Sequence, residues 1–560
     1  MLTYNFIVLA TVYAAAIVAA PAPAAKPPPS VRLDSGTFTG VSDGVSDAFL
    51  GIKFADAPRF SLPVPVGPYI DEEDAVDFGP ACPQQGSTGV RSMVDDPAAG
   101  VLVSEWRYPT RAKLPPSEDC LNLNVWVPAG TNSTARLPVA VWIFGGGFEN
   151  GSADTYDGGV IVKRSIELDE PVIYVSMNYR VSAFGFIAGE EVKAEGVGNI
   201  GLEDQRVAFR WIQKYITDFG GDPERVTIWG ESAGAISVAL HMLTNGGDPE
   251  GLFHGAFMQS GAPIPVGDIA KGQGEYDQLV QNTPCADIAS PKTLECLRNL
   301  PFDVLKQAVD KSPGIISEQS LRLAWLPRVD GRFLTDTPQN LVLQGSVARV
   351  PHVSGNVNDE GTLFSIINSL TVWTDRGFQS YMRSNYVDGA TDDDIGDLFD
   401  TLYPNDPSQG SPFDTGTNYS FPPQYKRLAA IQGDLVFQAP RRFFVEHTFD
   451  QQPTWSFLSK RTLTIGDSAF ELGRFGAAHG SDLGNVYGPG DMTSYLIHFV
   501  NRGDPNGAGD GLIEWPTYDN QTRQQLTFVD DIDTPLNITR DDYRVDGFSK
   551  LTELSLRFPL

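Results

Sequence analysis

The segment RVTIWGESAGA places Ser232 between Gly230 and Gly234, directly after a short apolar run. The run Val226–Trp229 has the composition of a buried strand, and the apolar stretch Ile236–Leu243 suits a helix. A chain that passes from strand to helix in so few residues needs a tight turn, in which glycines let neighbouring backbone approach without a Cβ clash. The pattern therefore predicts a strand–turn–helix unit that presents Ser232 at the carboxyl edge of a sheet.

Short apolar runs of the same kind recur along the chain, bounded by Gly, Pro or polar residues. Between them, the stretch Leu202–Phe219 spaces Val207, Trp211 and Tyr215 four residues apart, as on one face of a helix. Strands that alternate with helices predict the α/β class, with a large, mostly parallel sheet flanked by helices. The strand-like runs are Pro138–Phe144, Val172–Asn178, Val226–Trp229, Ala256–Gln259 and Val350–Ser354.

Charge and composition exclude several classes of protein. The 560 residues include 41 Lys and Arg against 70 Asp and Glu, a formal net charge of −29. This charge argues against nucleic-acid partners and anionic membrane surfaces, whose phosphates would be repelled. Six histidines and four cysteines are too few for a zinc-finger array or a multi-haem protein. No long low-complexity linker divides the later chain, so we expect one domain over residues 25–560.

The N-terminal residues have the pattern of a secretory signal peptide. The apolar run Phe6–Ala20 is shorter than a comfortable membrane span of about 20 residues, and no Lys or Arg precedes Lys26. We expect residues 1–24 to be removed as a signal peptide, with a retained anchor as the alternative. The sequons agree with secretion, and we expect the protein to be N-glycosylated, though not at Asn150, which lies inside a glycine-rich loop. The sequons begin at Asn132, Asn150, Asn418, Asn520 and Asn537.

A loop of three glycines, Gly145-Gly146-Gly147, follows the strand-like run that ends at Phe144. Acyl transfer develops negative charge on a carbonyl oxygen, and backbone N–H groups that converge on that oxygen stabilise it. A glycine loop allows the main chain to come close enough. The residue after a serine nucleophile on this kind of turn supplies another donor. We therefore expect an oxyanion hole formed by the N–H groups of Gly146, Gly147 and Ala233.

A serine nucleophile needs a general base, and the chain has six histidines. His241 and His254 follow Ser232 too closely. His447 and His498 lie in segments with the pattern of amphipathic helices, and His352 leaves little room for an acid between it and the serine. In this arrangement the order along the chain is serine, acid, histidine. His479, in a loop of small residues near the C-terminus, meets that order.

Two adjacent carboxylates compete for the role of the acid. Asp359 and Glu360 both follow the strand-like run Val350–Ser354. Either can orient the imidazole of His479 and stabilise its protonated form. The residues alone leave this choice open.

Taken together, these motifs resemble the type-B carboxylesterase/lipase family of α/β-hydrolases, which includes fungal lipases, carboxylesterases and cholinesterases. The resemblance extends over nearly the whole chain after the signal peptide. The segments that carry it are FLGIKFA (49–55), SEDCLNLN (117–124), GGGF (145–148), GNIGLEDQ (198–205), FGGDP (219–223), GESAG (230–234), DEGT (359–362) and HGSD (479–482).

The resemblance implies a catalytic triad of Ser232, Glu360 and His479, so it favours Glu360 over its neighbour. It also implies that Ser260 lies near the triad as a supporting hydroxyl. Further residues are expected to line the substrate pocket, two of them after the acid and one in the glycine loop. They are Leu363, Phe364 and Phe148.

Four cysteines permit three pairings, of which the resemblance implies Cys82–Cys120 and Cys285–Cys296. The resemblance also implies that the loop closed by the first pair corresponds to the lid region of the family. Its apolar residues suit a cover over the site that responds to a lipid–water interface, with ordinary loop packing as the alternative. They are Val90, Met93, Val94, Val101, Leu102, Val103 and Trp106.

We therefore expect a secreted serine hydrolase that cleaves fatty-acyl or related apolar esters through an acyl-enzyme, without a metal or organic cofactor. A short-chain or aryl carboxylesterase without interfacial activation is the first alternative. A non-catalytic, cholinesterase-like adhesion module is a distant one, because such a module would lack the serine, the histidine or the glycine loop.

One competing motif is set aside. The sequence GVGNIG at Gly196–Gly201 matches the glycine pattern of dinucleotide-binding proteins, which requires a preceding strand. The preceding residues, Glu190–Glu195, are polar and indicate a loop. We therefore expect no dinucleotide site here.

Overall fold

The computed structural model describes residues 27–86, 114–462, 475–507, 509 and 511–560. The expected signal peptide and the apolar residues of the expected lid lie outside these ranges. Within the described part of the chain, no helix is both long and apolar enough to cross a membrane.

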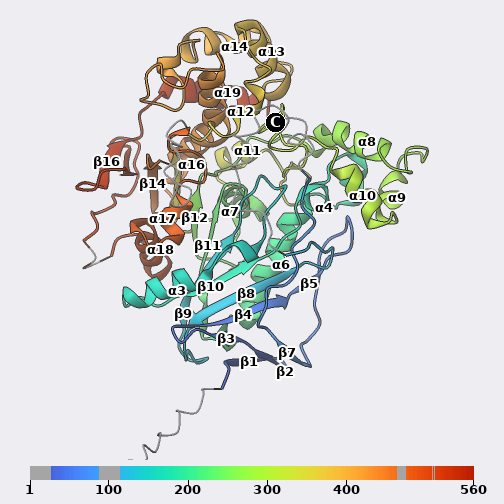
Figure 1. Ribbon diagram of the computed structural model, residues 1–560, viewed down its shortest axis with the longest axis vertical. Coiled ribbons are helices and arrows are strands. Elements are labelled where there is room, and N and C mark those ends of the chain that lie inside the picture. Colours follow the sequence, from blue (N-terminus) through green and yellow to red (C-terminus); the bar gives the residue numbers. More distant parts are fainter. Residues whose placement is uncertain (1–26, 87–113, 463–474, 508, 510) are drawn as a thin grey trace, which may run out of the picture.

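An eleven-stranded sheet forms the centre of the protein (Figure 1). The strands in its middle run parallel, and antiparallel strands extend both edges. The expected large, mostly parallel sheet is thus confirmed. In spatial order the parallel strands are β10 (Ile173–Met177), β9 (Leu137–Ile143), β11 (Gly221–Glu231), β12 (Gly255–Gln259), β13 (His352–Val357), β14 (Thr454–Ser459) and β15 (Gln524–Phe528). The edge strands are β8 (Asn122–Pro128), β4 (Ser46–Lys53) and β3 (Val41–Ser42) beyond β10, and β16 (Leu536–Arg540) beyond β15.

The order of the strands places helices on both faces. The chain moves from β9 through α3 (Gly158–Glu167) to β10 in one direction, and from β11 through α7 (Ala233–Leu243) to β12 in the other. Because such crossovers are right-handed, α3 and α7 lie on opposite faces. The direction reverses between β9 and β11, and ligands of open α/β sheets bind at the carboxyl ends of the strands at such a point.

The remaining helices extend these two layers and build the region above the carboxyl ends of the strands (Figure 1). Beside α3 lie α17 (Leu483–Tyr487) and α18 (Asp491–Arg502). On the side of α7 (Ala233–Leu243), α6 (Ile200–Tyr215) is hydrogen-bonded to it through Gln205. Helix α11 (Pro338–Leu343) contacts α7, α16 (Ala439–Thr448) contacts α11, and α19 (Val545–Arg557) contacts α16. The others are α4 (Ser182–Phe186), α5 (Glu190–Glu195), α8 (Gln273–Gln281), α9 (Thr293–Arg298), α10 (Phe302–Val309), α12 (Ser365–Asn368), α13 (Asp375–Tyr386), α14 (Asp392–Ile395) and α15 (Tyr425–Gly433).

The structure corrects one expectation and shifts the bounds of others. The polar stretch Glu190–Glu195, expected as a loop, is helix α5, which ends at Gly196 with φ 66°. A strand does not precede the glycine pattern that follows, so that motif still lacks the context of a dinucleotide site. The strand expected from Val350 begins instead at His352, because Pro351 has no N–H to donate to the ladder.

Both disulfides implied by the resemblance are present. Cys82 is bonded to Cys120, and Cys285 is bonded to Cys296.

Candidate active site

The predicted site residues follow neighbouring parallel strands. The glycine loop follows β9, Ser232 follows β11, and Glu360 follows β13. Pairing in register aligns the ends of these strands, with Glu231 opposite Gln259 and Gln259 opposite Gly355. The loops after the strands therefore meet at one edge of the sheet, at the point where the strand order reverses.

Ser232 lies on a strained turn between β11 and α7. Its φ of 56° and ψ of −125° belong to a region that residues with a side chain seldom adopt. The turn has no room for side chains beside it, because a Cβ at Gly234 would lie 2.0 Å from the carbonyl oxygen of Ile143. A Cβ at Gly230 would lie 2.5 Å from the carbonyl carbon of Gly234. The two glycines thus allow the turn to present Ser232 at the N-terminus of α7.

The glycine loop packs directly against this turn. A Cβ at Gly145 would lie 2.8 Å from the Cβ of Ser232. No hydrogen bond between described residues uses the N–H of Gly146, Gly147 or Ala233. The three donors expected for an oxyanion hole therefore remain available for a ligand.

His479 and Glu360 form a short hydrogen bond. The Nδ1 atom of His479 lies 2.5 Å from Oε2 of Glu360, and both side chains are buried. The other oxygen of Glu360 accepts hydrogen bonds from the Asn356 side chain and the Val357 N–H, both at 3.0 Å. These donors orient the carboxylate, which in turn holds the imidazole with Nε2 free. Within the described part of the chain, His479 Nε2 has no hydrogen-bond partner.

Asp359, the other candidate acid, has a different environment. Its oxygens accept hydrogen bonds from the Ser411 hydroxyl at 2.9 Å, the Phe413 N–H at 2.7 Å and the Ala477 N–H at 3.0 Å. Asp359 therefore joins two loops, one of which leads to His479. The structure separates two adjacent carboxylates that the residues alone leave equivalent.

Glu231, which the sequence reasoning missed, lies beside the imidazole. Its Oε1 is 3.4 Å from Nε2 of His479, and neither of its oxygens has a hydrogen-bond partner among the described residues. Burial raises the pKa of Glu231 to about 8, so the group is mostly protonated at neutral pH. The negative charge that stabilises a protonated His479 is then supplied mainly by Glu360. The feature of the sequence that could have identified Glu231 as a neighbour of the site is its position immediately before Ser232.

The environment of His479 leads to a prediction for the pH dependence of activity. Burial by itself lowers the pKa of His479, but the charge of the Glu360 carboxylate and its hydrogen bond to the ring outweigh this effect, so the pKa lies above the usual value of 6.5. Only neutral imidazole accepts a proton. We therefore expect kcat/KM for a soluble ester to fall on acidification, with its midpoint above pH 6.5. Fluorescence over the same pH range would separate this loss from unfolding, and a midpoint below 6.5 in folded protein would contradict the expectation.

Two aromatic rings contact His479. The ring of Phe364 lies 5.0 Å from the imidazole centroid, and that of Phe437 lies 4.6 Å from it. Leu363, with Phe475 and Ala478, forms a small apolar cluster. The ring of Phe148 is buried against Phe186 of α4. Three residues expected to line a substrate pocket are thus placed, although their contact with a substrate stays a prediction.

Ser260 lies beside the backbone of Ser232. The Ser232 N–H donates to the carbonyl of Gln259 at 2.9 Å, and a Cβ at Gly261 would lie 2.6 Å from the carbonyl oxygen of Ser232. The Ser260 hydroxyl is buried and has no hydrogen-bond partner among the described residues. This is the position that the resemblance implied, while the supporting role remains a prediction.

The other five histidines lie in other environments. His254 is exposed, and the rest have partners away from Ser232. His241 pairs with Gln205, His352 with Thr448, His447 with the carbonyl of Phe443 and His498 with Glu170.

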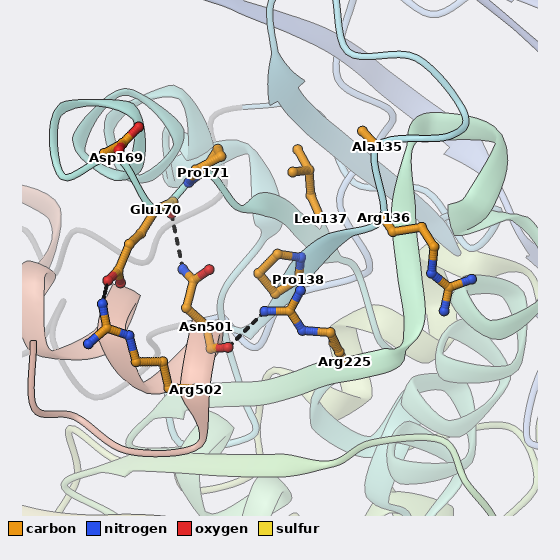
Figure 2. A pocket seen from close by; sticks show the side chains of 10 residues that line it. All are labelled: Ala135, Arg136, Leu137, Pro138, Asp169, Glu170, Pro171, Arg225, Asn501 and Arg502. Carbon is orange, nitrogen blue, oxygen red and sulfur yellow. Dashed lines mark hydrogen bonds and ion pairs between the residues drawn. The ribbon is translucent and has the colours of Figure 1, made fainter.

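A separate hollow of about 450 Å³ lies at the opposite ends of the strands (Figure 2). Its lining includes Leu137 at the start of β9 and Pro171 just before β10. Arg225 crosses it to donate to the carbonyl of Asn501 at 2.8 Å. None of the predicted site residues lines this hollow, so it does not compete with Ser232 as the candidate active site.

Known proteins are similar to this chain in sequence and in fold. A family model described as "Carboxylesterase family" matches residues 27–544. Lipase 4 of Diutina rugosa is 40% identical over 543 residues, which cover 93% of this chain and 95% of that protein. A protein named secreted triacylglycerol lipase from Gibberella zeae is 38% identical over 543 residues, covering 93% and 89%. The crystal structure of Aspergillus niger EstA matches with a TM-score of 0.78 at 26% identity, covering 95% of this chain and 99% of that one.

Proposed function

The chain belongs to the carboxylesterase family, and on this premise we propose that it is a secreted, lipase-like carboxylesterase with Ser232, His479 and Glu360 as its triad. The observation that carries the assignment of the residues is the 2.5 Å hydrogen bond between His479 and Glu360. This pair lies at the same edge of the sheet as the strained turn of Ser232.

In the first half of the reaction, Ser232 attacks the carbonyl carbon of the ester. His479 accepts the hydroxyl proton on Nε2 and then donates it to the leaving alcohol. Glu360 keeps the other ring nitrogen protonated and stabilises the imidazolium that forms in between. The products of this half are the free alcohol and an acyl group bonded to Ser232.

The tetrahedral intermediate carries its negative charge on the former carbonyl oxygen. The free N–H groups of Gly146, Gly147 and Ala233 stabilise that charge, as does the N-terminus of α7. Water then attacks the acyl-enzyme with His479 as the base, and the carboxylic acid leaves. These steps need no metal or organic cofactor.

Apolar side chains support fatty-acyl esters as the substrate class. Leu363 and Phe364 lie shortly after the acid, beyond Gly361 and Thr362, and Phe364 contacts the catalytic imidazole. Relatives of this chain are named lipases, and one is named a secreted triacylglycerol lipase. The expected lid residues lie outside the described residues, and their role at a lipid–water interface remains part of this proposal.

An extracellular location is proposed on two grounds. The two disulfides suit an oxidising compartment, and relatives are named as secreted. Removal of residues 1–24 and glycosylation of the sequons are further parts of the proposal.

Rates on esters of increasing acyl length test the substrate class. With soluble aryl esters and with triacylglycerol emulsions, we expect activity to favour medium and long acyl chains and to increase once the substrate exceeds its solubility. The measurement is initial rate against concentration across the solubility limit. A flat response with a short-chain optimum would remove the lipase-like assignment in favour of a short-chain carboxylesterase.

A further inference from the structure

Glu149 is a buried carboxyl group that the proposed mechanism does not use. It follows the glycine loop after one residue, Phe148, and is 1% exposed. One oxygen, Oε2, accepts the N–H of Ile315 at 2.8 Å. The other oxygen has no hydrogen-bond partner within the described ranges. Burying a charged carboxyl group costs free energy unless it is hydrogen-bonded, paired with an opposite charge or neutral.

The backbone of Glu149 helps to close the turn that contains the proposed oxyanion donors. The N–H groups of Glu149 and Asn150 both donate to the carbonyl of Gly146 at 3.1 Å. The peptide group between Gly146 and Gly147 is planar and trans, so its N–H points opposite to its C=O. Fixing the Gly146 carbonyl therefore fixes the direction of the Gly147 N–H.

The side chain of Glu149 anchors this turn to a second segment. Ile315, whose N–H it accepts, also covers the glycine loop, because a Cβ at Gly147 would lie 2.8 Å from Ile315 Cδ1. Gln85 adds a second connection, since its N–H donates to the Glu149 carbonyl at 2.9 Å and its side chain donates to Ser312 at 3.0 Å. Hydrogen bonds of Glu149 and Gln85 thus connect the turn to the segment 312–315.

We propose that Glu149 is a positioning residue for the oxyanion hole, which keeps the Gly147 N–H aimed at the site by binding the Ile315 backbone to the turn. This inference rests on the proposed function of that loop. It assigns Glu149 no contact with the substrate and no proton transfer.

The charge state of Glu149 is consistent with this role. Burial raises the pKa of Glu149 to about 8, so the group is mostly neutral at pH 7. A neutral carboxyl group provides the acceptor that Ile315 needs without placing a negative charge beside a developing oxyanion. Glutamine provides the same acceptor and is always neutral, which makes it the conservative replacement.

Three variants at this position test the inference with a soluble ester at pH 7. Glu149→Leu removes the acceptor, and we expect kcat to fall about 10- to 100-fold with KM within about twofold, because a misdirected donor acts mainly in the transition state. Glu149→Gln is expected to stay within about threefold of the unmodified enzyme. Glu149→Asp, which withdraws the oxygen by one methylene, is expected to be intermediate and serves as the second test where the leucine variant fails to fold.

A transition-state analogue gives a readout that loss of stability would not change. A trifluoromethyl ketone forms a hemiketal with the serine and places an oxyanion among the same N–H groups. Its affinity should weaken in proportion to kcat/KM across the three variants. A control away from the glycine loop is Glu191→Leu, since Glu191 is a buried carboxyl group that accepts from Ser290 and Gln273. We expect it to lose stability with kcat unchanged.

Two results would overturn the inference. One is a folded leucine or aspartate variant with kcat and analogue affinity equal to those of the unmodified enzyme. The other is a glutamine variant that loses as much activity as the leucine variant. Failure of the proposed function is distinguishable, because it would appear as full activity in Ser232→Ala irrespective of Glu149.

Discussion

Ser232→Ala is expected to lower kcat for ester hydrolysis by about 10⁴- to 10⁶-fold while the protein stays folded. Alanine lacks the hydroxyl that forms the acyl-enzyme, so only binding and the oxyanion donors would remain. The small methyl group fits where the serine side chain lies, at the edge of the sheet. Steady-state rates with a soluble aryl ester measure the loss, and thermal unfolding confirms the fold.

The alternatives to this account make a different prediction for the same variant. Another nucleophile would leave activity within about tenfold of the unmodified enzyme. A non-catalytic module would show no serine-dependent activity in either protein. Ser237→Ala is a suitable control, because this buried serine lies one turn further along α7 and its hydroxyl donates to the carbonyl of Ala233.

Glu360→Gln is expected to lower kcat by about 10³- to 10⁴-fold, which is the second largest effect. Glutamine retains the size of the side chain but has no charge to stabilise the imidazolium, and its amide favours the wrong tautomer of His479. The measurement is kcat with the same soluble ester, with thermal unfolding as a check on the fold.

Asp359→Asn is the matched comparison, because it makes the same change in the adjacent residue. Its carboxylate accepts from Ser411, Phe413 and Ala477 rather than from the imidazole. We expect a destabilisation of about 1–3 kcal/mol and a loss in kcat of less than about tenfold. The assignment of the acid would be reversed if the asparagine variant lost more activity than the glutamine variant.

Much of the fold was predictable because its signals are local. Buried parallel strands are short apolar runs, and the five expected runs lie in β9 to β13. The bounds of β11 and β13 were predicted least well, because β11 already begins at Gly221 and β13 runs from His352 to Val357. The turn at Ser232 was predictable because so tight a turn requires residues without a Cβ at Gly230 and Gly234. The family resemblance rested on motifs spread over the chain, and the family model confirms it.

The parts that the residues alone missed or left open depend on contacts between distant segments. Asp359 and Glu360 share one local sequence, and only the resemblance favoured Glu360. In the structure, Ser411 and His479 give the two carboxylates different partners. Phe437 reaches His479 from a π-helical turn, Asp434–Gln438, which has no periodic signal in the sequence. In the sequence, Glu149 is only a polar residue after a glycine loop. Its proposed role depends on Ile315, which is far along the chain and contacts it only in the folded protein.

Covalent labelling is the most direct test of the central claim, that Ser232 is an activated nucleophile. The protein is incubated with an organophosphonate that carries a good leaving group, then digested and analysed by mass spectrometry. We predict that one phosphonyl group is added to the peptide that contains Ser232, with loss of activity in the same proportion, and that Ser232→Ala takes up none. Complete inactivation with the label on another residue, or no label in active enzyme, would contradict the claim.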